Sequence, residues 1–225
     1  MKTNKTKRAG RSKRRTLKRK QRGGMRKLID GSVVEGEIHK GKVKGPGKRT
    51  FADGSVYEGP FDGFIPHGQG KLTMSDRQVY VGQFSNGGIN GRGRMTDTDG
   101  NVTEGEFITV QGVALAHGVG KLTYAATGTV YEGLFMNGMF NGPGTLTMTD
   151  GSVFEGHFRN GVVDGVGRLT HADGMMFEGL FRHINGELVH LDMPLLELKP
   201  GTSDTTLENL YDVERAIAER PSGAS

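Results

Sequence analysis

Residues 54–73 read Gly54-Ser55-Val56-Tyr57-Glu58-Gly59-Pro60-Phe61, then Gly63, Gly68-Gln69-Gly70 and Leu72-Thr73. Nearly the same pattern returns about every 23 residues along most of the chain. Self-similarity at a fixed period of this size indicates stacked similar units and not a single wrapped globule. The position of Tyr57 is taken in the other units by Val34, Tyr80, Thr103, Tyr131, Phe154 and Phe177.

Each unit alternates in a way that predicts two short strands. Tyr57, Gly59 and Phe61 share one parity, which is the period-two pattern of a strand, and the stretch 68–73 predicts a second strand. The residues between the two stretches turn the chain back, so each unit is expected to be a β-hairpin. Turns of the Ala52-Asp53-Gly54 type join one hairpin to the next. The units open at Gly31, Gly54, Arg77, Gly100, Gly128, Gly151 and Gly174.

The composition favours a thin, all-β structure. Glycine occurs 38 times at fixed offsets within the units, apolar residues are only 34 %, and tryptophan is absent. We therefore predict an elongated, single-layer antiparallel sheet of about seven stacked hairpins, with one apolar face. The chain has no cysteine, which excludes disulfides and thiolate metal sites.

The net charge of +5 hides two opposed parts. Residues 1–27 hold 14 of the 30 Lys and Arg residues and no Asp or Glu, which leaves 16 basic and all 25 acidic residues for the remainder. We divide the chain into a basic, disordered tail (1–28), the repeat array (29–190) and a C-terminal extension (191–225). In the extension, a pattern from Thr205 to Pro221 predicts a short amphipathic helix.

Two places break the repeat. Four extra residues lie between Phe107 and Gly118, and the apolar stretch 113–116 is interpreted as a bulge on a loop. The last unit, from Gly174 to Gly186, keeps its first strand and then departs from the pattern, as a terminal capping unit does.

The unit G-x-x-Y-E-G-x-F-x-x-G-x-x-x-x-G-x-G-x-L-T resembles the MORN repeat (membrane occupation and recognition nexus). The likeness covers about 160 residues and is best at 54–73, 128–147 and 151–170. It implies an elongated antiparallel sheet that is often dimeric, and scaffolding roles at membranes or the cytoskeleton, with anionic-lipid binding in some members. The basic tail with its KRKQRGG ending also resembles tails of some large DNA virus proteins, so a viral or protist origin is one expectation.

The aromatic face is the main candidate site. A single-layer sheet leaves an apolar stripe that needs a cover, which is the chain's own C-terminal helix, a second copy or a foreign protein. The expected partner-binding groove consists of Tyr57, Phe61, Tyr80, Phe84, Tyr131, Phe135, Phe154, Phe158, Phe177 and Phe181.

Motifs for catalysis or metal binding are weak, so we expect a non-enzymatic protein with no cofactor, no metal and no small-molecule substrate. The Gly-x-Gly pairs precede strands and not helices, so they offer no phosphate loop. The repeated glutamates are interpreted as a solvated ladder (Glu35, Glu58, Glu104, Glu132, Glu155, Glu178). The seven histidines lack metal-ligand spacing.

The basic tail is the second candidate site. Its charge suits an anionic lipid surface, nucleic acid or an import receptor, and the sequence does not separate these. The leading hypothesis is an interaction scaffold in which the groove binds a protein or itself and the tail binds anionic surfaces; the alternative is a lipid or nucleic-acid binder with the repeats as spacer. An intracellular, non-secreted location is expected. The tail residues expected to bind are Lys7, Arg8, Arg11, Lys13, Arg14, Arg15, Lys18, Arg19, Lys20 and Arg22.

Overall fold

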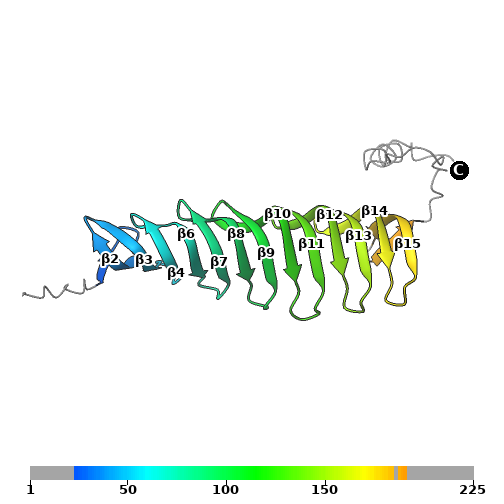
Figure 1. The fold of residues 1–225 in the computed structure, drawn as a ribbon, viewed down its shortest axis with the longest axis horizontal. Helices are drawn as coiled ribbons and strands as arrows, with labels where there is room; N and C mark the ends of the chain where they lie inside the picture. The colour runs from blue at the N-terminus through cyan, green and yellow to red at the C-terminus, as the bar shows by residue number, and fades with distance from the viewer. Residues whose placement is uncertain (1–22, 185–186, 192–225) are drawn as a thin grey trace, which may run out of the picture.

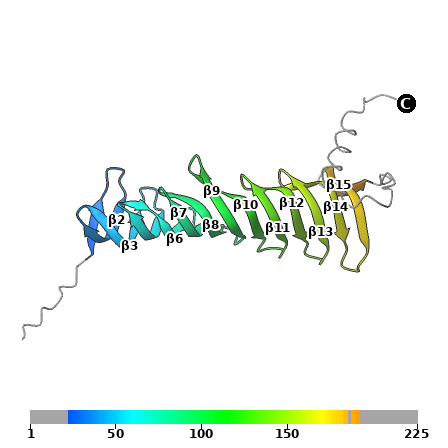
Figure 2. The same cartoon turned by 45° about the horizontal axis from the view of Figure 1, so that its top comes forward.

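The computed structural model describes residues 23–184 and 187–191 and contains one long, open antiparallel sheet (Figure 1). Within the described residues, each strand pairs with the next along the chain, except that β4 pairs both β6 and the short β5. The strands lie across a long ribbon, so the sequence order of the repeats is also their order in space (Figures 1 and 2). The strands are β1 (Gly24–Lys27), β2 (Val33–His39), β3 (Lys42–Thr50), β4 (Val56–Asp62), β5 (Ile65–Pro66), β6 (Gly68–Thr73), β7 (Val79–Ser85), β8 (Gly88–Thr96), β9 (Val102–Val110), β10 (Val113–Thr123), β11 (Val130–Met136), β12 (Met139–Thr147), β13 (Val153–Arg159), β14 (Val162–Thr170), β15 (Met176–Ile184) and β16 (Glu187–Leu191).

The hairpin tips are tight two-residue turns. Between β11 and β12 the chain turns through Asn137 and Gly138, whose φ angles are 51° and 83°. Two consecutive positive φ angles define a type I′ turn, whose twist matches that of the two strands it joins. The same pair of positive angles recurs at residues 40–41, 86–87, 111–112 and 160–161. These turns place the hairpin tips along one edge of the ribbon.

The turns between repeats line the other edge and are closed by aspartates. The Asp53 carboxylate accepts hydrogen bonds from the backbone N–H of Ser55 (2.9 Å) and from its hydroxyl (3.0 Å). The next turn is attached to this one, because Ser75 N–H donates to Ser55 Oγ (3.1 Å). The hairpin-tip edge is fastened in the same way where Gly138 N–H donates to the Ala116 carbonyl (2.8 Å).

A continuous row of glycines crosses the middle of the sheet. Glycine faces glycine on strand after strand, from Gly24 on β1 to Gly179 on β15. The Tyr131 ring lies flat on two of them: a Cβ placed on Gly144 would be 2.6 Å from its Cε2 atom, and one on Gly133 would be 2.5 Å from its hydroxyl oxygen. Only glycine permits this approach, so the row is what lets the aromatic rings lie on the sheet.

The rings form the core by packing on one another. We call the face that carries Tyr57 the inner face and the face that carries Glu58 the outer face. Ring contacts link Tyr57 to Phe84 (centroids 4.7 Å apart), and continue through Tyr80 to Phe107 (5.3 Å). A second run extends from Phe135 and Tyr131 to Phe181. The aromatic position between the two runs is a threonine, Thr103, so the core consists of two aromatic blocks.

The stretch 113–116 is not a loop bulge, which corrects the interpretation made from the sequence. Val113 begins β10, and the residues pair with β9 from Val113↔Val110 to Ala116↔Phe107. The extra residues therefore lengthen both strands of one hairpin before the turn at 111–112, and its tip extends beyond its neighbours in Figure 2. Within the run, Ala114 and Ala116 face the core, whereas Val113 is exposed.

The predicted all-β, single-sheet fold is confirmed. The last residues of the expected tail, 24–27, form β1 and pair with β2. The expected C-terminal helix lies outside the described residues. Within the described part of the chain, no helix is long and apolar enough to span a bilayer.

Candidate functional site

The predicted groove residues are mainly core. Eight of the ten rings are buried, with exposed fractions between 0 and 4 %, whereas Phe61 and Phe177 are half-buried. Their alternation predicted a stripe that needs a cover. In the structure the rings pack against one another, so they leave almost no surface that a partner could contact. A partner on the inner face would meet the residues beside the rings.

Those neighbouring residues form a second, half-buried row on the inner face. Leu72 lies opposite Tyr57 on the next strand, and Met74 follows where that strand ends. The same two positions recur in later repeats and pack partly buried against the core: Leu122, Tyr124, Leu146, Met148 and Leu169. Because these side chains are only half-buried, they give the inner face an accessible apolar surface, whereas the buried rings do not.

The inner face is hollowed at repeats two to four. An open cavity of about 520 Å³ lies there, with an apolar floor that includes Phe51, Leu72, Met74 and Met95. One wall comes from the turns around residues 53–55 and 75–78, and the other from the hairpin tips around 87–89 and 109–114. Both edges of the ribbon therefore border one concave surface, which we call the inner hollow.

The extended β9–β10 hairpin makes the inner hollow deeper than the repeat alone would. Its residues Thr109, Val113 and Ala114 line the cavity. The hairpin is held in place because the Thr109 hydroxyl donates to the Ile89 carbonyl at 2.7 Å. The insertion that breaks the repeat in sequence thus supplies a wall of the cavity in the structure.

The turn-side wall of the inner hollow carries carboxylates. Asp53 and Asp76 both line it, beside Ser55, Ser75 and Gln78. Asp76 accepts hydrogen bonds from the backbone N–H (3.0 Å) and the side-chain amide (2.9 Å) of Gln78. An apolar floor beside a negatively charged wall suits a ligand that combines apolar and basic side chains.

The tyrosine hydroxyls are structural. Tyr131 donates to the Leu134 carbonyl at 2.8 Å, and Tyr57 to the Pro60 carbonyl at 2.8 Å. Burial raises the pKa of Tyr131 to about 12, and it also raises the pKa of Tyr57 and Tyr80. A phenol with a raised pKa that donates to a backbone carbonyl is a poor acid–base group at neutral pH.

The repeated glutamates alternate with cations on the outer face. The six glutamates are all exposed, as expected of a solvated ladder, and the second strand of most repeats places Lys or Arg opposite them. Glu104 pairs with Arg94 (2.6 Å), and Glu132 pairs with Lys121 (2.8 Å). With the Glu178–Arg168 pair, three of the six repeated glutamates form exposed ion pairs with a cation on the neighbouring strand. The signal in the sequence was the basic residue directly before most Leu-Thr pairs, namely Lys71, Lys121 and Arg168.

In the described part of the chain, no group of three or more His, Asp or Glu side chains is arranged to hold a metal ion. His171 contacts the Phe177 ring (centroids 5.6 Å apart), and His190 contacts that of Phe181 (4.8 Å). These two histidines thus take part in the aromatic packing at the last repeat.

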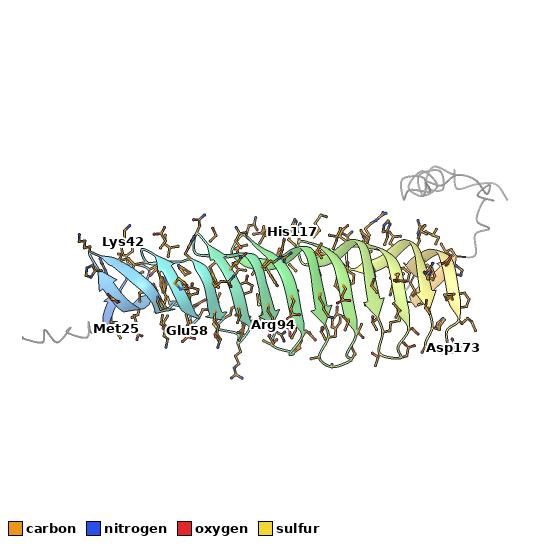
Figure 3. The ribbon with its side chains drawn as sticks, viewed as in Figure 1. Met25, Lys42, Glu58, Arg94, His117 and Asp173 are labelled. Atoms are coloured by element: carbon orange, nitrogen blue, oxygen red, sulfur yellow. The ribbon has the colours of Figure 1, made fainter. Side chains whose placement is uncertain are left out.

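The predicted anionic-surface residues, from Lys7 to Arg22, lie outside the described residues. The adjoining end of the sheet is also positively charged. Lys27, Lys40 and Lys42 are exposed there, as are Met25 (70 % exposed) and Ile29; Figure 3 labels Met25 and Lys42 at this end, on opposite edges of the sheet. Positive charge and exposed apolar side chains therefore meet at the β1 end of the sheet.

The repeat matches a known family. Five segments fit the family model described as MORN repeat, at residues 35–56, 65–79, 80–102, 131–153 and 154–176. Two intervals between these segments are unmatched, 57–64 and 103–130, and the longer one carries Thr103 and the extended hairpin. No curated protein matches the chain significantly in sequence.

Two solved structures are similar in shape. One is the TCP domain of SAS-4 (dCPAP) from Drosophila melanogaster in complex with a proline-rich motif of Ana2 (dSTIL), with a TM-score of 0.40, 8 % identity, and 79 % of this chain and 97 % of that chain covered. The other is the wild-type TCP10 domain of Danio rerio CPAP in complex with a peptide of Danio rerio STIL, with a TM-score of 0.34, 16 % identity, and coverage of 72 % and 70 %. At these low TM-scores the likenesses carry no argument about function.

Proposed function

Because the chain is a MORN-repeat protein, we propose that it is a non-enzymatic interaction module whose inner hollow binds a segment of a partner protein. The observation that carries this proposal is the cavity of about 520 Å³ with a floor of Phe51, Leu72, Met74 and Met95. Concave, mostly apolar surfaces with a few polar groups at the edge are where proteins bind ligands.

The groups around the inner hollow support binding more than chemistry. The carboxylates on its wall are already hydrogen-bonded within their own turns, as at Asp53 and Asp76. Among the residues that the structure describes, no lysine, arginine or histidine lines it. The lining pair within hydrogen-bond reach is the Ser55 hydroxyl and the Asp53 carboxylate (3.0 Å), and that hydroxyl also accepts from the Ser75 backbone N–H, so the pair fastens two turns together.

The chemistry of the hollow defines the class of partner. Apolar side chains of a peptide or helix would cover the floor, and a lysine or arginine beside them would lie near Asp53 and Asp76. An amphipathic segment with basic residues on its border combines these features. We propose such a segment as the ligand.

Peptide selection tests this proposal while the natural partner is still unidentified. The full chain is used to enrich a random-peptide phage library, and binding of the enriched peptides is measured by calorimetry to wild type, Met74→Glu and Met148→Glu. The two methionines occupy equivalent positions in their repeats, but only Met74 lines the inner hollow. We expect apolar, basic peptides that bind Met74→Glu about tenfold more weakly and Met148→Glu as wild type.

Two outcomes would count against the inner hollow. Either no peptide would be enriched over a scrambled-library background, or the two variants would weaken binding equally. Thermal unfolding of both variants is the control for effects on the fold. If both variants lose the same amount of stability, a difference in their peptide binding comes from the inner hollow.

We further propose that the basic end of the molecule binds an anionic membrane surface. Exposed Met25 and Ile29 on either side of Lys27 favour a membrane over nucleic acid, because apolar side chains gain from insertion between lipid headgroups, and Lys40 and Lys42 add charge at the same end of the sheet. The tail residues Lys7 to Arg22 would add charge at the same end. The absence of aromatic residues from the tail argues against base stacking.

Vesicle sedimentation tests the membrane proposal. Deletion of residues 1–22 is expected to weaken binding to phosphatidylserine-containing vesicles and to reduce its salt dependence. The pair Met25→Ser and Ile29→Ser is expected to weaken vesicle binding and leave binding to a DNA duplex unchanged. Met175→Ser, at an exposed methionine (54 %) near the other end, is the control. Equal loss of vesicle and DNA binding in the serine variant would contradict the proposal.

A further inference from the structure

The hairpin tip between β11 and β12 carries two methionines that the repeat does not require. Met136 and Met139 flank the turn and lie directly opposite each other on the two strands. At the other hairpin tips of the described residues, the two flanking positions hold these pairs: His39 and Lys42, Asp62 and Ile65, Ser85 and Gly88, Val110 and Val113, Arg159 and Val162, and Ile184 and Glu187. Among these hairpins, a pair of thioethers therefore marks a single tip.

Both thioethers lie on the outer face. Their neighbours Phe135 and Phe140 are buried in the core. Because successive side chains of a strand point to opposite faces, Met136 and Met139 point outward, and they are 49 % and 51 % exposed. Side chains directly opposite each other on antiparallel strands have Cβ atoms about 4.5–5.5 Å apart. Methionine is unbranched and flexible, so both sulfur atoms can turn toward one common point.

An imidazole lies beside the two thioethers, on the neighbouring strand β10. The residue after His117 lies opposite the residue before Met136. The residue before His117 accepts a hydrogen bond through its carbonyl from Gly138 N–H, at 2.8 Å. His117 is therefore next to Met136 in the register of the sheet. It is exposed and points outward, since Ala116 before it belongs to the core, and Figure 3 labels it at the hairpin-tip edge.

The side chains around these three residues leave the site to soft ligands. Leu134 lies two positions before Met136 on the same strand and face, and Leu115 lies two positions before His117. Such apolar neighbours limit the access of water to a bound ion. The nearest carboxylate is Glu106, which lies opposite His117 on β9 and is paired with Arg92 at 3.8 Å.

We propose that His117, Met136 and Met139 bind a copper(I) ion, and we call these residues the thioether site. Thioether sulfur is a soft ligand that selects copper(I), whereas magnesium and calcium prefer carboxylate and carbonyl oxygens. The chain has no cysteine, so no thiolate competes for a soft ion. Two thioethers and one neutral imidazole supply three uncharged donors, which suit an ion with a single charge.

The thioether site differs from the metal sites that a sequence search looks for. Its ligands come from three strands, and only one of them is a histidine, so the linear spacing of the histidines does not reveal it. It also differs from the clusters of His, Asp and Glu that the described part of the chain lacks, because two of its three donors are sulfur atoms. The register of β10, β11 and β12 is what brings the three side chains together.

The thioether site is independent of the inner hollow, because it lies on the opposite face of the sheet. A bound ion would connect β10, β11 and β12, and thus two successive repeats. Since such an ion binds the folded chain through residues that unfolding separates, it would raise the melting temperature.

Titration of the full chain with silver(I), a redox-inert ion of the same charge and similar softness, tests the site. Native mass spectrometry counts the bound ions, and anaerobic competition with bicinchoninate gives the copper(I) affinity. We expect one tightly bound ion in wild type, and about 100-fold weaker binding by Met136→Leu/Met139→Leu. Leucine nearly conserves the volume of methionine, so the fold is kept while the sulfur is lost. His117→Gln is expected to weaken binding about tenfold.

The matched control is Met175→Leu/Met176→Leu. These two methionines are 54 % and 64 % exposed, but they are adjacent in the sequence and not opposite each other across a hairpin. The control is expected to bind copper(I) as wild type does. Methyl NMR of labelled methionine locates the ion, and we expect silver(I) to shift the signals of Met136 and Met139 but not those of Met175 and Met176.

Three results would overturn the thioether site. The first is a wild-type chain that binds copper(I) no more tightly than Met136→Leu/Met139→Leu. The second is silver(I) that shifts all exposed methionine signals alike, which would mean unspecific contact with thioethers. The third is unchanged affinity in His117→Gln, which would remove the imidazole from the site. Thermal unfolding without metal checks that every variant is folded, and silver(I) should stabilise wild type and not the double leucine variant.

Discussion

At the scale of the residue, the fold depends on rings that lie directly on glycines. A methyl group on Gly144 would be 2.6 Å from Tyr131 Cε2, which is closer than carbon atoms approach. We therefore predict that Gly144→Ala lowers the free energy of unfolding by about 1–3 kcal/mol, the usual cost of overpacking. Urea denaturation measures it, with Thr145→Ala on the outer face as the control. Equal stability of Gly144→Ala and wild type would mean that the ring moves away at no cost.

Arg77 is a residue in a conformation that suits glycine. It occupies the turn position that is glycine in the other repeats, and its φ angle is 78°. A left-handed conformation costs a residue with a Cβ about 1–2 kcal/mol. Arg77→Gly is therefore predicted to stabilise the protein by about 1 kcal/mol, and Gly151→Arg to destabilise it by a similar amount. Thermal unfolding of both variants checks the prediction, and a loss of stability in Arg77→Gly would contradict it.

The buried tyrosines predict a sensitivity to alkaline pH. The unfolded chain loses the Tyr131 proton near pH 10, whereas the folded protein keeps it until about pH 12, because burial favours the neutral phenol and so raises its pKa. Stability from this group is complete below pH 10 and is lost as pH rises from about 10 to 12. Tyr131→Phe should be less stable than wild type at pH 8, because Tyr131 donates to Leu134, and should lose less stability between pH 8 and 11.5. Parallel curves for the two proteins would exclude this linkage.

Alternation in the sequence predicted which residues share a face, but not how exposed that face is. Tyr57 and Tyr80 were correctly placed on one side of the sheet. Their exposure depends on curvature and on contacts between repeats, such as Tyr57 with Phe84, and neither is encoded in a period of two. The accessible apolar surface of the inner face therefore belongs to half-buried neighbours such as Leu72 and Met74, and not to the rings that the sequence pointed to.

At the scale of the element, the extended β9–β10 hairpin differs most from the repeat. The sequence revealed the insertion as an irregularity of spacing. It did not reveal that Val113 pairs with Val110, because register depends on the partner strand and on the turn at 111–112. The continuous apolar run 113–116 directly after Gln111-Gly112 was the available signal.

Shortening this hairpin separates its role in folding from its role in the inner hollow. Deletion of Thr109, Val110, Val113 and Ala114 leaves Ile108-Gln111-Gly112-Leu115, which matches Met136-Asn137-Gly138-Met139 of the next repeat. The shortened chain is predicted to fold, with a melting temperature within a few degrees of wild type, because the type I′ turn is kept. It should bind selected peptides about tenfold more weakly, since Thr109, Val113 and Ala114 line the cavity. Unchanged affinity of a folded variant would remove the hairpin from the binding site.

At the scale of the whole molecule, the sheet offers different surfaces in different places. The inner hollow lies at repeats two to four, exposed Val119, Met136 and Met139 lie near the middle on the other face, and positive charge gathers at the β1 end. The period predicted the extended single sheet, which is confirmed. These surfaces arise from departures from the period, at Val119, Met136 and the long hairpin, so the consensus of the repeat could not predict them.

The central claim is that partners bind in the inner hollow and not on the aromatic rings or the outer face. Hydrogen–deuterium exchange of the full chain, with and without a selected peptide, tests this claim most directly. Binding in the hollow predicts slower exchange of backbone amides at residues 51–55, 72–78 and 109–114, with no change at the equivalent segment 146–152. Protection confined to the outer face or to the β1 end, or no protection at saturating peptide, would contradict it.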